Sequence, residues 1–76
     1  MTRDALLREL EMALEYQPGS ISATSTLADI QWDSLAEIAF VAFADRKLGV
    51  ALASDQLRAC QDVADLIRLL GSKVVD

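Results

Sequence analysis

The chain has 76 residues, and its apolar residues include only two Phe, one Trp and one Tyr, so we expect one domain, residues 1–76, with a core of aliphatic side chains packed between helices. The net charge is -5 with seven scattered basic residues, which excludes nucleic acid as a partner. A single cysteine and the lack of a secretory signal at the amino terminus predict a cytoplasmic protein. No apolar run approaches the roughly 18 residues of a membrane span, so we expect a soluble protein without membrane insertion. We also expect the protein to be a monomer.

The first predicted helix covers residues 3–15. Thr2 can cap it, and its apolar residues recur at helical spacing with Glu9, Glu11 and Glu15 interspersed between them. We expect this helix to pack one face on the core.

A long loop follows, over residues 17–33, and begins at the helix-breaking pair Pro18-Gly19. Loops of this length are usually functional or disordered, and spaced apolar residues indicate that this one is held against the body of the domain. The expected anchors are Tyr16, Ile21, Leu27, Ile30 and Trp32. The loop therefore delivers the chain to a specific place.

The second predicted helix covers residues 34–48. Asp33 is a good N-cap residue, which places Ser34 at the helix entrance, and Gly49 ends the helix.

Two shorter helices complete the predicted all-α, four-helix architecture. The third covers residues 55–59 with Ser54 as its cap, and the fourth covers residues 62–70 with Asp62 as its cap. The tail after Gly71 is expected to fray.

The second helix carries the most information, because both of its faces are apolar on a helical wheel. The predicted core face consists of Phe40, Val41, Ala44 and Leu48, with Glu37 at its edge and Phe43 between the two faces. The outward face consists of Leu35, Ile38, Ala39 and Ala42, followed by Asp45 and Arg46. An exposed apolar strip usually marks a docking surface, and the alternative is that a neighbouring helix covers part of it.

Ser34 is the candidate chemical residue, although a serine at a helix start is more often a cap. The chain has no histidine, no Gly-rich phosphate loop and no Cys/His metal set, so it offers no base to activate a hydroxyl. If Ser34 reacts, another protein supplies the catalysis, and the chain is a substrate rather than an enzyme. We interpret Cys60 as a small core residue rather than a reactive thiol.

The order of these parts resembles the acyl and peptidyl carrier protein family over nearly the whole chain. The loop carries a leucine-x-aspartate lead-in in residues 26–30 (TLADI), followed by residues 32–35 (WDSL) in place of the family's Asp-Ser-Leu signature. Further matches are Phe40, Val41 and Leu48 in the second helix, then Gly49-Val50 and Leu52, and residues 62–66 (DVADL) at the start of the fourth.

The resemblance implies a four-helix bundle whose third helix is the shortest, and it implies a carrier function. Ser34, flanked by Asp33 and Leu35, would hold a 4'-phosphopantetheine arm derived from coenzyme A. A phosphopantetheinyl transferase with bound magnesium would attach the arm, and its thiol would carry acyl or aminoacyl groups as thioesters. The implied partners are that transferase, an acyl-loading enzyme, either a ligase or an acyltransferase, and a downstream synthase or transferase. The Ala-rich second helix does not decide whether the acyl cargo folds back into the bundle.

Two departures from the family pattern bear on its specificity. Gln31 stands where a glycine commonly precedes the signature, so the loop is expected to bend differently. The second helix is less acidic than in fatty-acid carriers, with Ala36, Ala39 and Ala42 and then Arg46-Lys47, so its docking surface (Leu35, Ile38, Ala39, Ala42 and Arg46) should depend more on apolar contact. The net negative charge either steers the chain toward basic surfaces or only keeps it soluble.

These departures favour a free-standing carrier for a dedicated polyketide, nonribosomal peptide or specialised acyl-transfer pathway. The alternatives are a housekeeping carrier of fatty-acid synthesis and a helical interaction module without a prosthetic group, in which Asp33 and Ser34 only cap a helix.

Overall fold

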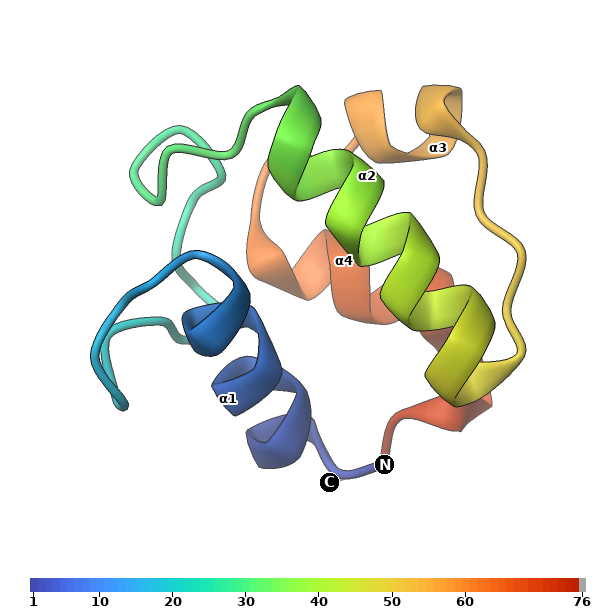
Figure 1. Ribbon diagram of the computed structural model, residues 1–76, viewed down its shortest axis with the longest axis horizontal. Coiled ribbons are helices and arrows are strands. Elements are labelled where there is room, and N and C mark those ends of the chain that lie inside the picture. Colours follow the sequence, from blue (N-terminus) through green and yellow to red (C-terminus); the bar gives the residue numbers. More distant parts are fainter. Residues whose placement is uncertain (76) are drawn as a thin grey trace.

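The computed structural model describes residues 1–75 as a small helical bundle around one core (Figure 1). In chain order the elements are α1 (Arg3–Ala13), α2 (Ser34–Phe43), the π-helical turn η1 (Ala44–Leu48), α3 (Ser54–Arg58), α4 (Val63–Leu70) and the 3-10 turn η2 (Gly71–Lys73). The predicted all-α class with a short third helix is therefore confirmed. No helix in this part of the chain is long and apolar enough to cross a membrane.

Polar side chains cap the N-termini of α1 and α4, as predicted. The Oγ1 of Thr2 accepts the Ala5 N–H at 3.1 Å, and the Asp62 carboxylate accepts the N–H of Asp65 at 2.9 Å. Asp62 itself lies outside α4, which begins one residue later than predicted.

The predicted cap of α3 is wrong. Ser54 is already inside that helix, and the N-cap is Ala53, whose side chain cannot accept a hydrogen bond. The amide oxygen of Gln56 instead reaches back to the Ala53 N–H at 2.8 Å. A residue within the helix thus satisfies a backbone donor at its start, and α3 spans residues 54–58 instead of 55–59.

The end of α1 comes two residues before the predicted boundary. The N–H of Tyr16 bonds to the Glu11 carbonyl at 2.8 Å and the N–H of Glu15 bonds to the Met12 carbonyl at 3.3 Å, which together form a Schellman cap. This cap needs a left-handed residue, and Glu15 adopts it with φ 63°. Because no glycine marks this position, the boundary is invisible in the sequence.

The helix predicted over residues 34–48 is helical throughout but changes type. It is α-helical to Phe43 and then widens into the π turn η1 before Gly49, at φ 67°, ends it. The predicted stop at Gly49 is confirmed. Nothing in the residue pattern distinguishes η1 from the α-helix before it.

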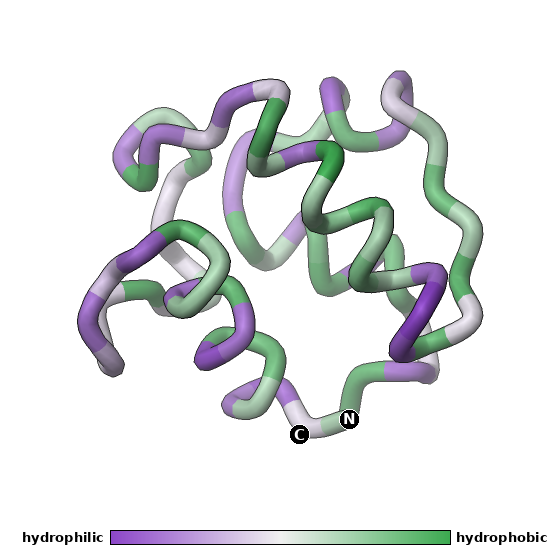
Figure 2. Tube along the Cα trace, in the orientation of Figure 1, coloured by the Kyte–Doolittle hydropathy of each residue, from purple (hydrophilic) through white to green (hydrophobic). Residues whose placement is uncertain are grey.

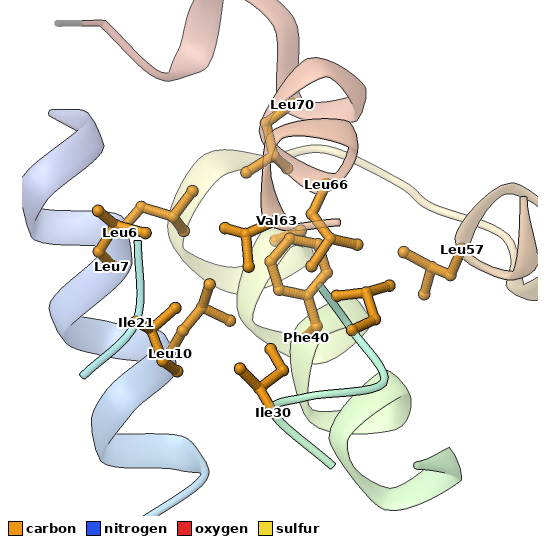
Figure 3. Close-up of a cluster of buried hydrophobic side chains, with 12 residues drawn as sticks. Leu6, Leu7, Leu10, Ile21, Ile30, Phe40, Leu57, Val63, Leu66 and Leu70 are labelled. Atoms are coloured by element: carbon orange, nitrogen blue, oxygen red, sulfur yellow. The ribbon is translucent and has the colours of Figure 1, made fainter. Parts of the chain in front are cut away.

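The core combines side chains from every α-helix and from the long loop (Figure 3). Its buried members are Leu6, Leu7, Leu10, Ile21, Leu27, Ile30, Phe40, Ala44, Leu57, Val63, Leu66 and Leu70. Tyr16 and Trp32 are half-buried and pack against this cluster, so all five predicted loop anchors are confirmed. Figure 2 shows apolar residues recurring along the helices, with α2 apolar over most of its length.

The loop is also held by backbone hydrogen bonds to the start of α4. The N–H of Leu27 bonds to the Gln61 carbonyl at 2.9 Å, and the N–H of Val63 bonds to the Ser25 carbonyl at 3.0 Å. These bonds fix the middle of the loop against a helix distant in sequence, as expected of a loop that positions the residue at its end.

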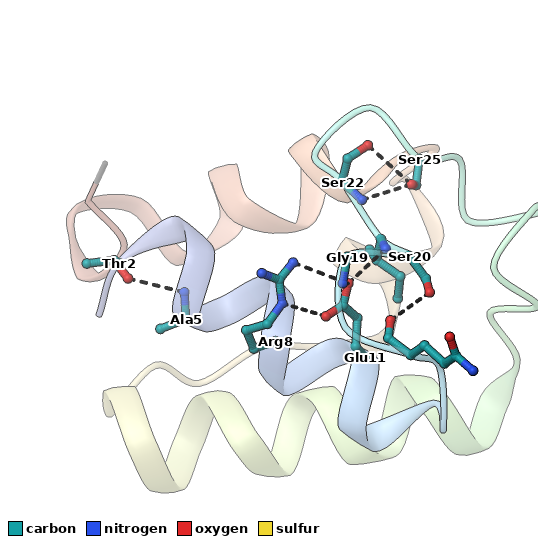
Figure 4. A network of polar contacts seen from close by, with 10 residues as sticks. Thr2, Ala5, Arg8, Glu11, Gly19, Ser20, Ser22 and Ser25 are labelled. Carbon is teal, nitrogen blue, oxygen red and sulfur yellow. Dashed lines mark hydrogen bonds and ion pairs between the residues drawn. The ribbon is translucent and has the colours of Figure 1, made fainter.

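Glu11 carries a buried carboxylate. The helical pattern of the sequence did not distinguish it from Glu9 and Glu15, which were predicted in the same helix. Glu11 is 1% exposed, pairs with Arg8, and accepts the backbone N–H groups of Gly19 and Ile21 at 2.8 and 2.9 Å (Figure 4). Hydrogen bonding to Arg8, reinforced by those N–H groups, lowers the pKa of Glu11. Glu11 therefore ties the start of the loop to α1.

Residues 72–75, after Gly71, do not fray as predicted, and residue 76 lies outside the described residues. The N–H of Val75 bonds to the Met1 carbonyl at 2.9 Å, and the N–H of Arg3 bonds to the Val75 carbonyl at 2.7 Å. The two ends of the described chain consequently lie side by side (Figure 1). A pairing between residues more than 70 positions apart has no local signature in the sequence.

Candidate functional site

Ser34 is the first residue of α2, and its side chain is exposed. Asp33, in extended conformation, is the N-cap, and its carboxylate accepts the Ala36 N–H at 2.9 Å. Among the described residues, nothing hydrogen-bonds the Ser34 hydroxyl. The predicted cap at Asp33 is confirmed, and Ser34 is free of any capping task.

The electrostatic setting of Ser34 suits an anion. The first turn of an α-helix has unpaired N–H groups and a partial positive charge, which stabilise a phosphate placed there. The ionisable side chains of this turn are the carboxylates of Asp33 and Glu37, and the chain has no histidine. The first turn of α2 can hold a phosphoester, and the chain has no histidine to act as a base for forming one.

The outward face of α2 is exposed and apolar beside Ser34. Leu35 is 75% exposed and Ile38 is 65% exposed, and Ala39 and Arg46 are exposed as well. Ala42 is half-buried and lies at the edge of this face. Leu35 and Ile38 are exposed, whereas the half-burial of Ala42 agrees with the alternative in which a neighbour covers part of this face.

The inward face of α2 agrees with the predicted core face, with one correction. Phe40 and Ala44 are buried, while Val41 and Leu48 pack partly buried against the core. Ala36, grouped above with the alanines of the docking helix, is only 8% exposed and belongs to the inward side.

Two hollows that have four lining residues in common lie between α1 and α2, and the sequence did not predict them. The first has a volume of about 220 Å³ and lies between Leu10 and Ala13 of α1 and Phe40 and Phe43 of α2. Phe43, unassigned between the two faces, is half-buried at this hollow. The second, of about 320 Å³, extends toward the entrance of α2.

The loop immediately before the site contains a left-handed turn at Gln31. Its φ is 57°, a conformation that favours glycine. The residue type departs from the glycine of the carrier pattern, yet Gln31 adopts the conformation that glycine favours. The expectation that this loop bends differently from that of the family stays a prediction.

Cys60 follows α3 and is half-buried against the core. Burial raises the pKa of its thiol, and the Sγ donates to the Gln56 carbonyl at 3.5 Å. The packing of Cys60 against the core agrees with its interpretation as a small apolar residue, and a raised pKa disfavours the nucleophilic thiolate.

Comparison with known protein families gives a match that covers most of the chain. The family model described as a phosphopantetheine attachment site matches residues 4–70, which include the loop, α2 and Ser34. No curated protein and no solved structure gives a significant match.

Proposed function

Because the chain belongs to the phosphopantetheine attachment-site family, we propose that Ser34 is the residue that carries the arm. The family establishes the general role. The chain is a carrier protein, not an enzyme, and it holds its cargo as a thioester on a covalently attached 4'-phosphopantetheine group. When attached, that group supplies the terminal thiol of the thioester.

The observation that carries the assignment is the free hydroxyl of Ser34. Asp33 caps α2, so Ser34 is exposed at the helix entrance without a partner in the described chain. A phosphodiester at this oxygen would lie beside the open N–H groups of the first turn, without displacing a core residue. The residues present therefore fit the group.

The reaction at Ser34 requires catalysis from a partner. The chain has no histidine to act as a base, so a phosphopantetheinyl transferase takes the hydroxyl proton. The Ser34 oxygen then attacks the pyrophosphate of coenzyme A, and the nucleotide leaves. In this step Asp33 holds the helix start in place and Ser34 is the substrate.

The partners dock on the outward face of α2 and η1, formed by Leu35, Ile38, Ala39, Ala42 and Arg46. The exposure of Leu35 and Ile38 next to Ser34 supports this docking surface, because exposed apolar patches mark places where other proteins bind. The partners are the transferase, a loading ligase or acyltransferase, and a downstream synthase or transferase.

The pathway is a dedicated one, such as polyketide, nonribosomal peptide or specialised acyl transfer. The apolar docking face and the basic pair Arg46-Lys47 support it over housekeeping fatty-acid synthesis, whose carriers are strongly acidic on this helix. One shared core over residues 1–75 supports a single carrier domain. The cytoplasmic location stays a prediction from the sequence.

Mass spectrometry tests the attachment site. The purified chain is incubated with coenzyme A and a broad-specificity phosphopantetheinyl transferase, and we expect one added arm, on the peptide that contains Ser34. Ser34→Ala should abolish the addition. Ser54→Ala is the matched control, since Ser54 is also exposed as the first residue of a helix, and it should be modified like the parent chain. An unmodified parent chain, or an arm retained by Ser34→Ala, would falsify the assignment.

A further inference from the structure

The hollow of about 320 Å³ at the entrance of α2, called the entrance hollow below, is formed by three segments of the chain. Its lining comes from residues 13–16 at the end of α1, from Ile30 and Gln31 of the long loop, and from the first two turns of α2. Ligand sites in proteins have volumes of about 300–1,000 Å³. The entrance hollow is therefore large enough to hold part of a flexible chain.

The entrance hollow borders the position of Ser34. Asp33 and Leu35, the two chain neighbours of Ser34, both line it, and the Ser34 side chain is exposed. A group attached to the Ser34 oxygen therefore begins at the edge of the hollow. The phosphate of the arm would stay at the first turn of α2, so the uncharged remainder of the arm is the part that can lie in the hollow.

The lining combines apolar surface with polar side chains that are available to a ligand. Glu15 and Gln31 are exposed and Tyr16 is half-buried. No hydrogen bond or ion pair joins any of these three side chains to another residue of the described chain. A carboxylate accepts hydrogen bonds, whereas a carboxamide and a phenol both donate and accept them. Ile30 and Leu35 supply apolar surface in the same hollow.

Two strained backbone positions meet at the entrance hollow. Glu15 and Gln31, with φ values of 63° and 57°, are the non-glycine residues with positive φ among residues 1–75, and both line the hollow. Such conformations persist only where the surrounding structure holds them, and they cluster at ligand sites. The bond from the Tyr16 N–H to the Glu11 carbonyl, at 2.8 Å, holds the turn at Glu15. The side of the hollow formed by the end of α1 is thus held in place without a ligand.

We propose that the entrance hollow is a binding site for the prosthetic arm, in which Glu15, Tyr16 and Gln31 hydrogen-bond its amide and hydroxyl groups. Ile30 and Leu35 contact its methyl and methylene groups. This inference rests on the assignment of Ser34 as the attachment residue. The arm presents donors, acceptors and apolar surface, as the lining of the hollow does. Because the arm beyond its phosphate is uncharged, the Glu15 carboxylate meets an amide N–H and not an anion.

Isotope-filtered NMR tests this site, because the arm can be transferred from unlabelled coenzyme A to protein labelled with ¹³C and ¹⁵N. Nuclear Overhauser effects between unlabelled and labelled protons then report the contacts of the arm alone. Tyr16 is the only tyrosine of the chain and is distant from Ser34 in the sequence, so contacts between its ring and the arm are specific to an occupied hollow. We expect these contacts in the arm-bearing protein, together with contacts to the Leu35 methyl groups.

A variant that fills the hollow should remove the contacts with Tyr16. Ala13→Leu places a larger side chain at the end of α1, where Ala13 lines the hollow. Ala5→Leu is the matched control, because Ala5 is also an exposed alanine of α1 but lines neither hollow, and it should keep the contacts. Circular dichroism checks that both variants are folded, and the spectra of the parent chain test the site without them. Equal contacts in Ala13→Leu and Ala5→Leu overturn the inference.

The results also separate the inference from the carrier function on which it rests. Complete attachment, verified by mass, without any contact between the arm and Tyr16 overturns the inference and leaves the assignment of Ser34 intact. Contacts found only with Ile38 and Ala42 have the same meaning, because they place the arm on the outward face of α2. Absence of any attachment overturns both the inference and the assignment.

Discussion

At the entrance of α2, Asp33 caps the helix and the adjacent Ser34 keeps its hydroxyl exposed. The Asp33 carboxylate accepts the Ala36 N–H at 2.9 Å, whereas the adjacent Ser34 hydroxyl has no partner in the described chain. A serine that capped the helix would have its oxygen engaged by a backbone N–H. The aspartate makes the serine available, and it also fixes the helix end that would receive the phosphate.

This arrangement predicts that Asp33→Ala impairs both stability and modification. Loss of an N-cap costs about 1 kcal/mol of unfolding free energy, and a frayed helix start presents Ser34 poorly. Urea unfolding gives the first quantity, and the rate of arm transfer gives the second.

Asp62→Ala is the matched control, because Asp62 caps α4 with the same geometry, its carboxylate lying 2.9 Å from the Asp65 N–H. Asp62→Ala should lose a similar amount of unfolding free energy, and its rate of arm transfer should not change. Asp33→Asn keeps a capping oxygen and should retain both properties. An equal loss of transfer rate in Asp33→Ala and Asp62→Ala would show that the effect is only one of stability.

Ile38→Asp should weaken docking while leaving the fold intact. Ile38 is 65% exposed, so a charge there costs little stability but disrupts an apolar contact with a partner. We expect kcat/KM of the transferase to fall at least about ten-fold, at an unchanged melting temperature.

Met12→Asp is the control for Ile38→Asp, because Met12 is 66% exposed but lies on α1. Its kcat/KM should match that of the parent chain. Equal rates for all three proteins would remove the docking role from this face of α2.

Glu11→Gln should destabilise the domain and reduce its sensitivity to acid. The carboxylate accepts two loop N–H groups and pairs with Arg8, and we expect the melting temperature at neutral pH to fall by more than about 5 °C. Its lowered pKa means that the folded state binds the proton more weakly than the unfolded chain. This stabilisation is present above the ordinary Glu value of about 4.3 and is lost as the pH falls through the lower pKa of the folded state.

Melting temperatures measured from pH 7 to pH 2 check this prediction. The decline should be shallower in Glu11→Gln but not absent, because hydrogen bonding to the Gln61 N–H also lowers the pKa of Asp65. Glu9→Gln, which removes a carboxylate without these loop contacts, should follow the parent chain. Parallel curves for the parent and Glu11→Gln would rule out this role of the carboxylate.

Glycine at the two left-handed positions should stabilise the fold. Glu15 and Gln31 have φ values of 63° and 57°, a conformation that disfavours residues with a side chain. Glu15→Gly and Gln31→Gly should each raise the unfolding free energy by up to about 1 kcal/mol. Gly49→Ala, at φ 67°, should lower it, and urea unfolding measures all three. Destabilisation by Glu15→Gly would show that its side chain contributes more than its backbone costs.

Local patterns were sufficient for several parts of this protein. The caps at Thr2, Asp33 and Asp62, and the stop at Gly49, follow from side-chain chemistry at a helix end. The two faces of α2 follow from helical periodicity, which depends only on neighbouring residues. The signature around Ser34, and through it the family, is likewise a property of consecutive residues.

Other features depend on segments that meet only in the folded chain. Glu11 is buried because Gly19 and Ile21, eight and ten residues further on, fold back onto it. The end of α1 at Ala13 needs Glu15 in a left-handed conformation that its residue type does not announce. The hollows between α1 and α2 likewise depend on packing between segments. The sequence alone thus determined which residue carries the arm's signature, whereas tertiary structure decided what surrounds it, because burial and hydrogen-bond pairing are properties of segments brought together by folding.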